Sequence, residues 1–405
     1  MGRALAVVIA GVAGFPGAGV AGFSGAAAAD PIVNRDYAIE LYDGVAIGDS
    51  SLTSMGGAGA ARVNGSAGVL INASAPAVRR TTDNDSWSWD YHLDFLTGRF
   101  STDYDNNGQV VGDEGGASLV TSGLALRFGK WSGALTVTGQ TAPIDGSVMP
   151  ELVAEALRVK FVIARWIPSW DLALGFGFQI ATFNLRTTGG DQNVVFGLTG
   201  AAGVAGATWL PRGESYRVAL ALESRIVGNQ LETTCDPEAC DPDPTDADTT
   251  TYILPNTVEA PGRTIVGVAY RWAATPWNEQ VTTKFRDEQS LTIAGDLVLA
   301  GSSANGHGIE AFAARELQRS GSKVTISPRL GAEVEALPGR LRVRAGSYWE
   351  PSRFEGVRGR IHGTFGLELR ALELRLWGVR RGKLGLTTDF ARRYRNIGFS
   401  IGFWH

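Results

Sequence analysis

Apolar and polar residues alternate with a period of two through residues 118–140. Leu124 and Leu126 fall on one face of an extended chain, whereas Ala125 and Arg127 fall on the other. A second arm repeats the alternation after a two-residue Gly-Lys turn, which predicts a β-hairpin. One face is apolar and the other is small or polar, which is typical of a membrane-spanning barrel with lipid outside and a lumen inside.

The alternation continues from Ser86 to the C-terminus. We expect the apolar rows to face lipid, and the charged residues of opposite parity to face the lumen. The rows include Trp87, Trp89, Tyr91, Leu93 and Phe95; Leu157, Val159, Phe161 and Ile163; Phe196, Leu198, Ala202 and Val204; Leu372, Leu374 and Leu376; and Ile397, Phe399, Ile401 and Phe403. The charged residues are Arg217, Glu223, Arg225, Asp296, Arg329, Glu333, Arg342, Arg344, Glu368, Arg370, Glu373 and Arg375.

A soluble β-sandwich has the same alternation with the two faces reversed, so the period alone does not separate the two classes. Six Trp residues lie close to short turns, as in the aromatic girdle of a membrane barrel, although Trp near a turn also closes the end of a soluble core. They are Trp131, Trp166, Trp170, Trp209, Trp272 and Trp277. Short turns alternate with long connections at 99–117, 141–153 and 228–262, as expected of periplasmic turns and outer loops.

Residues 86–405, at roughly 23 residues for each strand and its connection, predict an all-β antiparallel transmembrane barrel of about fourteen strands. Two segments fit this pattern poorly. The connection 275–289 is long although it falls on the short-turn side, and 307–320 alternates so weakly that we expect a helical turn or an irregular strand.

The N-terminal part of the chain has a different composition. Residues 1–29 combine Arg3, an apolar stretch and a final Ala-Ala-Ala, which predicts a signal peptide cleaved near Ala29. The alternative is a membrane anchor helix, which Pro16 and the many Gly residues disfavour. Residues 30–85 are rich in Gly, Ala and Ser and carry too few bulky side chains to form a core alone. We therefore expect this segment to pack as a hatch, or plug, inside the barrel of residues 86–405.

The composition limits the partners. The 405 residues include 53 Gly and 19% charged residues, with a formal net charge of −4. This near-neutral balance, without Lys/Arg clusters, argues against nucleic acid. No apolar run after the N-terminus reaches the roughly eighteen residues of a helical span. We expect a monomer in bacterial outer-membrane lipid, delivered to the barrel-assembly machinery through its C-terminal strand.

The segment 103–114 matches a calcium-loop pattern, D-x-[DN]-x-[DN]-G-x5-E. Carboxylate and carbonyl oxygens at this spacing suit Ca²⁺, and the alternative is an ordinary acidic outer loop, since the flanks are predicted strands instead of helices. The candidate ligands are Asp103, Asp105, Asn107, Gln109 and Glu114. No other cofactor is predicted.

The only two cysteines, Cys235 and Cys240, lie in the acidic stretch 235–248. In an exported protein we expect them to form a disulfide within a surface loop. Four His residues lie in separate segments, and none is beside a recognisable nucleophile motif. The sequence therefore predicts no catalytic residue and no enzyme.

Two short motifs resemble those of the FadL-type outer-membrane transporters. The hatch motif has a Met-Gly-Gly-Ala-Gly run followed about fifteen residues later by Asn-Pro-Ala; here the Asn is separated from the Pro-Ala. Near the C-terminus, residues 344–352 (RAGSYWEPS) resemble the penultimate region of that family. The hatch-motif residues are Met55, Gly56, Gly57, Gly59, Asn72 and Pro76.

The resemblance implies a fourteen-strand plugged barrel that carries hydrophobic molecules, such as long-chain fatty acids, and releases them sideways through the wall beside a kinked strand. It identifies no ligand-binding residue. Two other functions remain open: a structural or assembly barrel without transport, and a general diffusion pore.

Overall fold

The computed structural model describes residues 30–41, 44–45, 48–78, 86–100, 103–108, 115–144, 152–187, 194–228, 252–281, 285–375 and 379–403. The predicted signal peptide, both cysteines, Gln109 and Glu114 lie outside these ranges. No helix within them combines the length and apolarity needed to cross a membrane.

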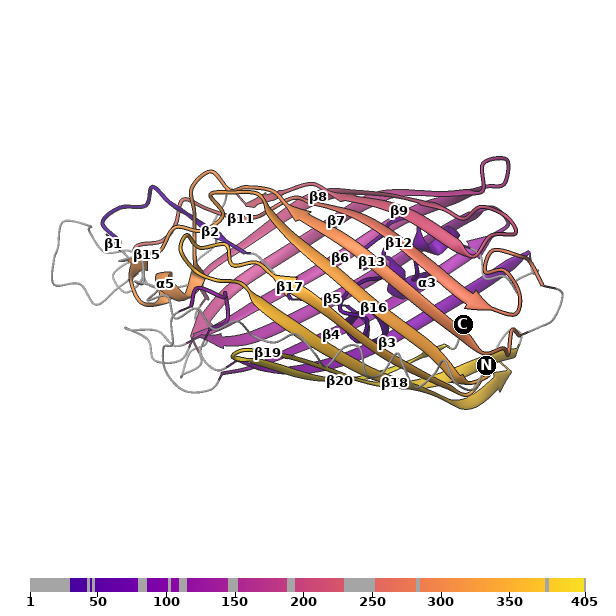
Figure 1. Ribbon diagram of the computed structural model, residues 1–405. Coiled ribbons are helices and arrows are strands. Elements are labelled where there is room, and N and C mark those ends of the chain that lie inside the picture. Colours follow the sequence, from indigo (N-terminus) through magenta and orange to yellow (C-terminus); the bar gives the residue numbers. More distant parts are fainter. Residues whose placement is uncertain are drawn as a thin grey trace.

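Fourteen antiparallel strands close into a barrel, which confirms the predicted fold (Figure 1). The last strand pairs with the first, with Ile401 opposite Leu93. The strands are β3 (Trp87–Phe100), β4 (Gly115–Phe128), β5 (Trp131–Ile144), β6 (Leu152–Ile167), β7 (Leu172–Thr187), β8 (Val194–Trp209), β9 (Tyr216–Glu223), β12 (Arg263–Ala273), β13 (Ser290–Ala300), β16 (Thr325–Leu337), β17 (Leu341–Glu350), β18 (Arg360–Arg375), β19 (Val379–Ala391) and β20 (Tyr394–Phe403).

Strands β4 and β5 form the predicted hairpin, with the turn closed by Gly129 at φ +58°. Leu124 and Leu126 on the outer face are 43% and 39% exposed, whereas Ala125 and Arg127 on the inner face are each 5% exposed. The predicted sidedness is thus confirmed for this hairpin. The belt of exposed apolar side chains around the barrel is the surface that a membrane-spanning barrel presents to acyl chains.

The apolar row of β8 faces the lumen, so its predicted lipid-facing orientation is wrong. Phe196, Leu198 and Val204 are 0%, 6% and 8% exposed. The opposite parity of β8 carries small residues such as Ala201 and Gly203, which are exposed. Because neither face is charged, the alternation did not determine which side points outward.

Three charged residues predicted to line the lumen are exposed instead. Glu373 and Arg375 lie in the last three residues of β18, and the bulge between Arg370 and Leu372 keeps Glu373 on the side of its buried partner Arg381, so their exposure reflects their place at the end of the strand. Arg225 is exposed because it lies just beyond the end of β9.

The two ends of the barrel differ in their connections. Short connections at 129–130, 168–171 and 210–215 lie at one end, the turn end. Longer ones, including 224–262, 301–324 and 351–359, lie at the other, the loop end. The loop-end connection 301–324 contains β14 (Gly306–His307), α5 (Ile309–Ala313) and β15 (Glu316–Leu317), which confirms the predicted helical turn.

The plug occupies the barrel interior (Figure 1). It contains α2 (Ser50–Thr53), α3 (Gly65–Gly68) and the 3-10 turn η1 (Ala75–Ala77). Wall carboxylates accept hydrogen bonds from its backbone: Asp94 from Ser50 N at 2.9 Å, and Asp90 from Ser66 N at 2.7 Å. The plug is therefore held through its own N–H groups as well as by apolar residues such as Met55 and Val69, which pack against the wall.

The N-terminal segment continues from the plug to the loop end. There β2 (Ala38–Glu40) lies in a four-stranded sheet, in the order β10 (Ile226–Gly228), β11 (Thr257–Ala260), β2 and β14. The shorter β1 (Asp30–Pro31) pairs with β15. The loop-end connections and the N-terminal segment thus form one joint cap.

Candidate functional site

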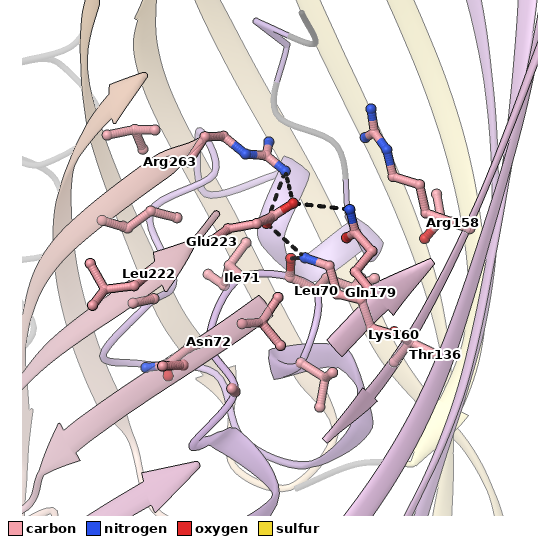
Figure 2. A pocket seen from close by; sticks show the side chains of 18 of the residues that line it. Leu70, Ile71, Asn72, Thr136, Arg158, Lys160, Gln179, Leu222, Glu223 and Arg263 are labelled. Carbon is pink, nitrogen blue, oxygen red and sulfur yellow. Dashed lines mark hydrogen bonds and ion pairs between the residues drawn. The ribbon is translucent and has the colours of Figure 1, made fainter. Parts of the chain in front are cut away.

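A cavity lies between the plug and the barrel wall. It contains about 850 Å³ of empty space, part of it continuous with solvent. Plug residues 69–73 form one side, and β5 to β9 and β12 form much of the other (Figure 2). The lining includes Val69, Leu70, Ile71, Asn72, Thr136, Thr138, Arg158, Lys160, Gln179, Val204, Glu223, Arg263 and Ile265.

Glu223, the last residue of β9, organises the polar part of the cavity. Its carboxylate accepts hydrogen bonds from Lys160 Nζ at 3.1 Å, Gln179 Nε2 at 3.1 Å and Arg263 Nη2 at 3.2 Å (Figure 2). Lys160 Nζ also donates to the plug carbonyl of Leu70 at 3.1 Å. One carboxylate therefore joins β6, β7, β9 and β12, and Lys160 connects them to the plug.

Cations outnumber anions around this part of the cavity. Arg158, Lys160 and Arg263 line it together with Glu223 as the neighbouring carboxylate. The positive excess favours a ligand that carries a negative group. None of the three cations was predicted from the sequence as a site residue. The available signal was their lumen-facing parity between apolar residues such as Val159 and Phe161.

Two smaller spaces lie between this cavity and the loop end. The first, about 300 Å³, shares Arg158, Gln179, Glu223 and Arg263 with it. The second, about 340 Å³, shares Leu41, Arg158, Ile226 and Ala260 with the first. Around the second space the lining becomes apolar, with Phe183, Leu198 and Val258.

Beyond these spaces lies a buried apolar cluster at the loop end. Aromatic side chains from distant parts of the chain meet there, with Phe312 stacked on Tyr252 at 5.1 Å between ring centroids and edge-on to Phe196 at 5.3 Å. The cluster also includes Tyr37, Ile39, Leu152, Phe183, Leu185, Val195, Leu198, Leu254, Val258 and Ile309. A packed apolar cluster at the loop end thus lies beyond the cationic cavity.

The wall beside the cavity is incompletely paired. Only Val204–Trp209 of β8 pair with β9, because β9 ends at Glu223. Ser224 still exchanges hydrogen bonds with Gly203, both at 2.9 Å. Beyond that point, β10 pairs with β11, and no strand of the described residues pairs with the rest of β8 on this side. We call the junction of residues 200–203 with 224–226 the β8 seam.

The hatch-motif residues are buried where the plug touches the wall. Gly56 and Gly57 have φ of +63° and +72°, a region that favours glycine. Gly56 N donates to Thr364 on β18 at 2.9 Å, and Gly59 N donates to Asp296 on β13 at 2.8 Å. The backbone of Met55 lies against β17, since a Cβ added at Gly346 would be 2.3 Å from the Met55 carbonyl carbon.

The second hatch element is also buried. Asn72 Nδ2 donates to Ala60 O at 2.9 Å and to Thr208 Oγ1 at 3.0 Å. Its Oδ1 accepts from Ser74 N at 3.0 Å, and Pro76 lies in the buried 3-10 turn. Asn72 thus ties two plug segments to β8, and it also lines the cavity.

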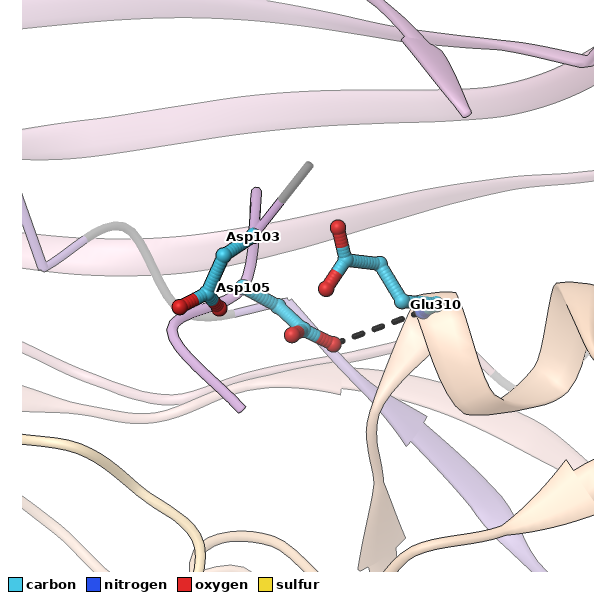
Figure 3. A group of neighbouring side chains, drawn as sticks. All are labelled: Asp103, Asp105 and Glu310. Atoms are coloured by element: carbon cyan, nitrogen blue, oxygen red, sulfur yellow. Dashed lines mark hydrogen bonds between the residues drawn. The ribbon is translucent and has the colours of Figure 1, made fainter. Parts of the chain in front are cut away.

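The calcium candidates are only partly brought together. Asp103 and Asp105 meet Glu310 of α5, and one carboxylate oxygen of each lies within 4.8 Å of the others (Figure 3). Asn107 is 2% exposed in the same loop but is outside this three-carboxylate group. Burial is the largest cause that raises the pKa of Asp105, to about 6. Sequence reasoning missed Glu310 because it lies 205 residues after Asp105.

No family model matches the chain, and no curated protein matches it in sequence. Solved structures match its fold. The toluene transporter TodX of P. putida has a TM-score of 0.52 at 11% identity, covering 88% of this chain and 97% of TodX. A FadL homologue from Pseudomonas aeruginosa has a TM-score of 0.50 at 12% identity, covering 88% and 97%. The chain is thus a plugged membrane-spanning barrel, and its fold is that of the FadL-type channels.

Proposed function

We propose that this protein transports hydrophobic small molecules across a bacterial outer membrane. The observation that carries the proposal is the cavity between the plug and the wall, with its cations and apolar lining, together with the apolar cluster at the loop end. A water-filled pore offers an alkyl chain no affinity, whereas burial in an apolar site contributes about 0.8 kcal/mol per methylene. The FadL-type fold supports the same reading.

The chemistry of the cavity favours an amphiphile with a negative head, such as a long-chain fatty acid. Its alkyl chain would be buried near Leu198 and Val258, and its carboxylate would approach Arg158 and Arg263. TodX is described as a toluene transporter, and toluene has no such head. We therefore expect this barrel to bind a fatty acid more tightly than a neutral aromatic hydrocarbon.

The β8 seam is the exit that the geometry favours. It borders the first smaller space through Ser224 and Ile226, and its outer face carries small residues. Fewer hydrogen bonds join the two sides of the seam than join two fully paired strands. Opening the wall there therefore breaks fewer hydrogen bonds. Ligand leaving here would enter the membrane sideways and bypass the plug.

The remaining partners follow from the same proposal. The signal peptide would direct export, the exposed apolar belt would contact outer-membrane lipid, and β20 would present the C-terminal strand to the barrel-assembly machinery. We propose a monomer without enzymatic activity. A diffusion pore agrees less well with the structure because wall carboxylates hold the plug by its backbone.

Ligand binding to the purified barrel tests this function. We expect radiolabelled oleate to bind saturably, and Val204→Trp, which fills the cavity, to weaken binding at least tenfold. Leu220→Trp on the lipid face is the matched control, since Leu220 is 42% exposed. Heat-modifiable gel mobility shows that each variant is folded. Equal oleate binding by both folded variants would contradict the proposed site.

A further inference from the structure

A calcium-type loop at the loop end is not used by the transport route. Residues 103–108 follow β3, and Gly108 makes the turn at φ +82°. The loop lies against α5, whose own connection follows β13. The contact brings two acidic residues of the loop beside one acidic residue of α5.

Backbone N–H groups orient all three carboxylates. Asp103 Oδ1 accepts from Gly108 N at 3.2 Å, and Asp105 Oδ2 accepts from Glu310 N at 3.3 Å. Glu310 Oε1 accepts from Tyr104 N at 2.6 Å. These bonds hold the acids in a group whose oxygens lie within 4.8 Å of one another.

One oxygen of this group lacks a partner. Asp105 Oδ1 is completely buried and has no hydrogen-bond partner among the described residues. Figure 3 shows it on the side of the carboxylate that faces Asp103. A buried carboxylate oxygen without a donor carries a desolvation cost that a bound cation would remove.

Positive side chains compensate the acids only partly. Arg393 Nη1 is 3.6 Å from Asp103 Oδ2, and Arg360 Nη1 donates to the backbone carbonyl of Asp103 at 3.4 Å. Burial, followed by repulsion from Asp105, raises the pKa of Glu310 well above its ordinary value. Two guanidiniums thus lie beside Asp103, whereas Asp105 and Glu310 form no ion pair with a cation among the described residues.

We propose that Asp103, Asp105 and Glu310 bind a calcium ion that joins the first loop to α5. Calcium accepts oxygen ligands in flexible geometry, whereas Mg²⁺ demands near-ideal octahedral geometry. The ligand set departs from the twelve-residue loop pattern because Glu310, from another connection, supplies the third carboxylate. Since Phe312 of the same helix lies in the apolar cluster, the ion also stabilises that cluster at the loop end of the barrel.

Equilibrium dialysis of the full chain in detergent with radioactive Ca²⁺ tests this site. We expect one ion per chain, with a dissociation constant on the order of 10⁻⁴ to 10⁻³ M as in extracellular calcium modules, and no displacement by equimolar Mg²⁺. Glu310→Gln and Asp105→Asn should each weaken binding at least tenfold. Glu355→Gln, on an exposed loop-end acid paired with Lys323, is the control and should bind as the wild type does.

Two results would overturn the site. One is the absence of Ca²⁺ binding by the wild-type chain. The other is unchanged affinity in folded Glu310→Gln, which would place the ion elsewhere, for example in the acidic stretch 235–248 that this variant leaves intact. Gel mobility establishes folding, and Asp105→Asn provides an independent variant if Glu310→Gln does not fold. Neither result bears on fatty-acid binding by the cavity.

Discussion

Glu223 and Arg263 face each other across the last rung of the β9–β12 ladder, and Arg263 Nη2 lies 3.2 Å from Glu223 Oε2. Directly beyond this pair, β9 ends and the wall beside β8 loses its ladder partner. The same pair lines the cavity. The residues that end the continuous wall are therefore those that give the cavity its charge.

Glu223→Gln should destabilise the barrel. Lys160 and Arg263 would lose their shared carboxylate in a largely buried site, and breaking a buried ion pair costs about 3–5 kcal/mol. Arg263 is 26% exposed, so we expect a loss at the lower end of that range. Urea unfolding in detergent measures it. Glu214→Gln, at an exposed turn position, should change the unfolding free energy by less than about 0.5 kcal/mol, and equal effects would contradict the role of Glu223.

Asp296→Ala should loosen the plug. Its Oδ2 accepts hydrogen bonds from Gly59 N at 2.8 Å and Ala60 N at 2.9 Å, and each bond to a charged acceptor contributes about 1.5–3 kcal/mol. We expect the variant to show frequent openings in planar bilayers, where the wild type shows little steady current. Glu279→Gln, exposed at the turn end, serves as the control. If the Asp296→Ala barrel conducts as little current as the wild type, the position of the plug does not depend on this carboxylate.

Gly346→Val should prevent the plug from packing against β17. The added Cβ would lie 2.3 Å from the carbonyl carbon of Met55, closer than real Cβ contacts allow, and the obstacle is backbone. We predict increased protease cleavage between β2 and β3 in the folded barrel. At Gly363, on β18, an added Cβ meets no atom within 4 Å, so Gly363→Val should leave the cleavage pattern unchanged.

A disulfide across the β8 seam should slow release of ligand. Gly203→Cys with Ser224→Cys, in a chain whose native cysteines are replaced by Ser, would link residues that already exchange hydrogen bonds. We expect fatty-acid uptake to fall under oxidising conditions and to recover on reduction. Ala207→Cys with Leu220→Cys joins paired positions of the same strands and should have no effect. Unimpaired uptake by the oxidised seam variant would place the exit elsewhere.

The sequence predicted the barrel well because the period of two is set by the backbone of a strand. In the β4–β5 hairpin, apolar residues such as Leu124 fall on the lipid-facing side, and small or polar residues fall on the lumen side. The prediction was wrong for β8, where Phe196 and Leu198 face an apolar interior and small residues face outward, so hydrophobicity does not distinguish the sides. At the end of β18 the lumen parity of Glu373 agrees with its pairing to Arg381, but the side chain is exposed because the strand ends there.

The site was harder to predict than the fold. Asp103 and Asp105 were found because they are close in sequence, whereas Glu310 reaches them only through the packing of two loops. The cavity cations lie on β6 and β12, which are separated in the wall by β7, β8 and β9. Their convergence on Glu223 depends on where β9 ends, and no local pattern marks that position.

Uptake by whole cells tests the central proposal most directly. Cells that lack their own fatty-acid uptake barrel would be compared with and without this chain, using radiolabelled oleate and, in parallel, radiolabelled glucose. We predict that the chain raises oleate uptake several-fold and leaves glucose entry unchanged. Oleate uptake equal to that of cells without the chain, or a parallel rise for both solutes, would contradict a plugged carrier of hydrophobic molecules.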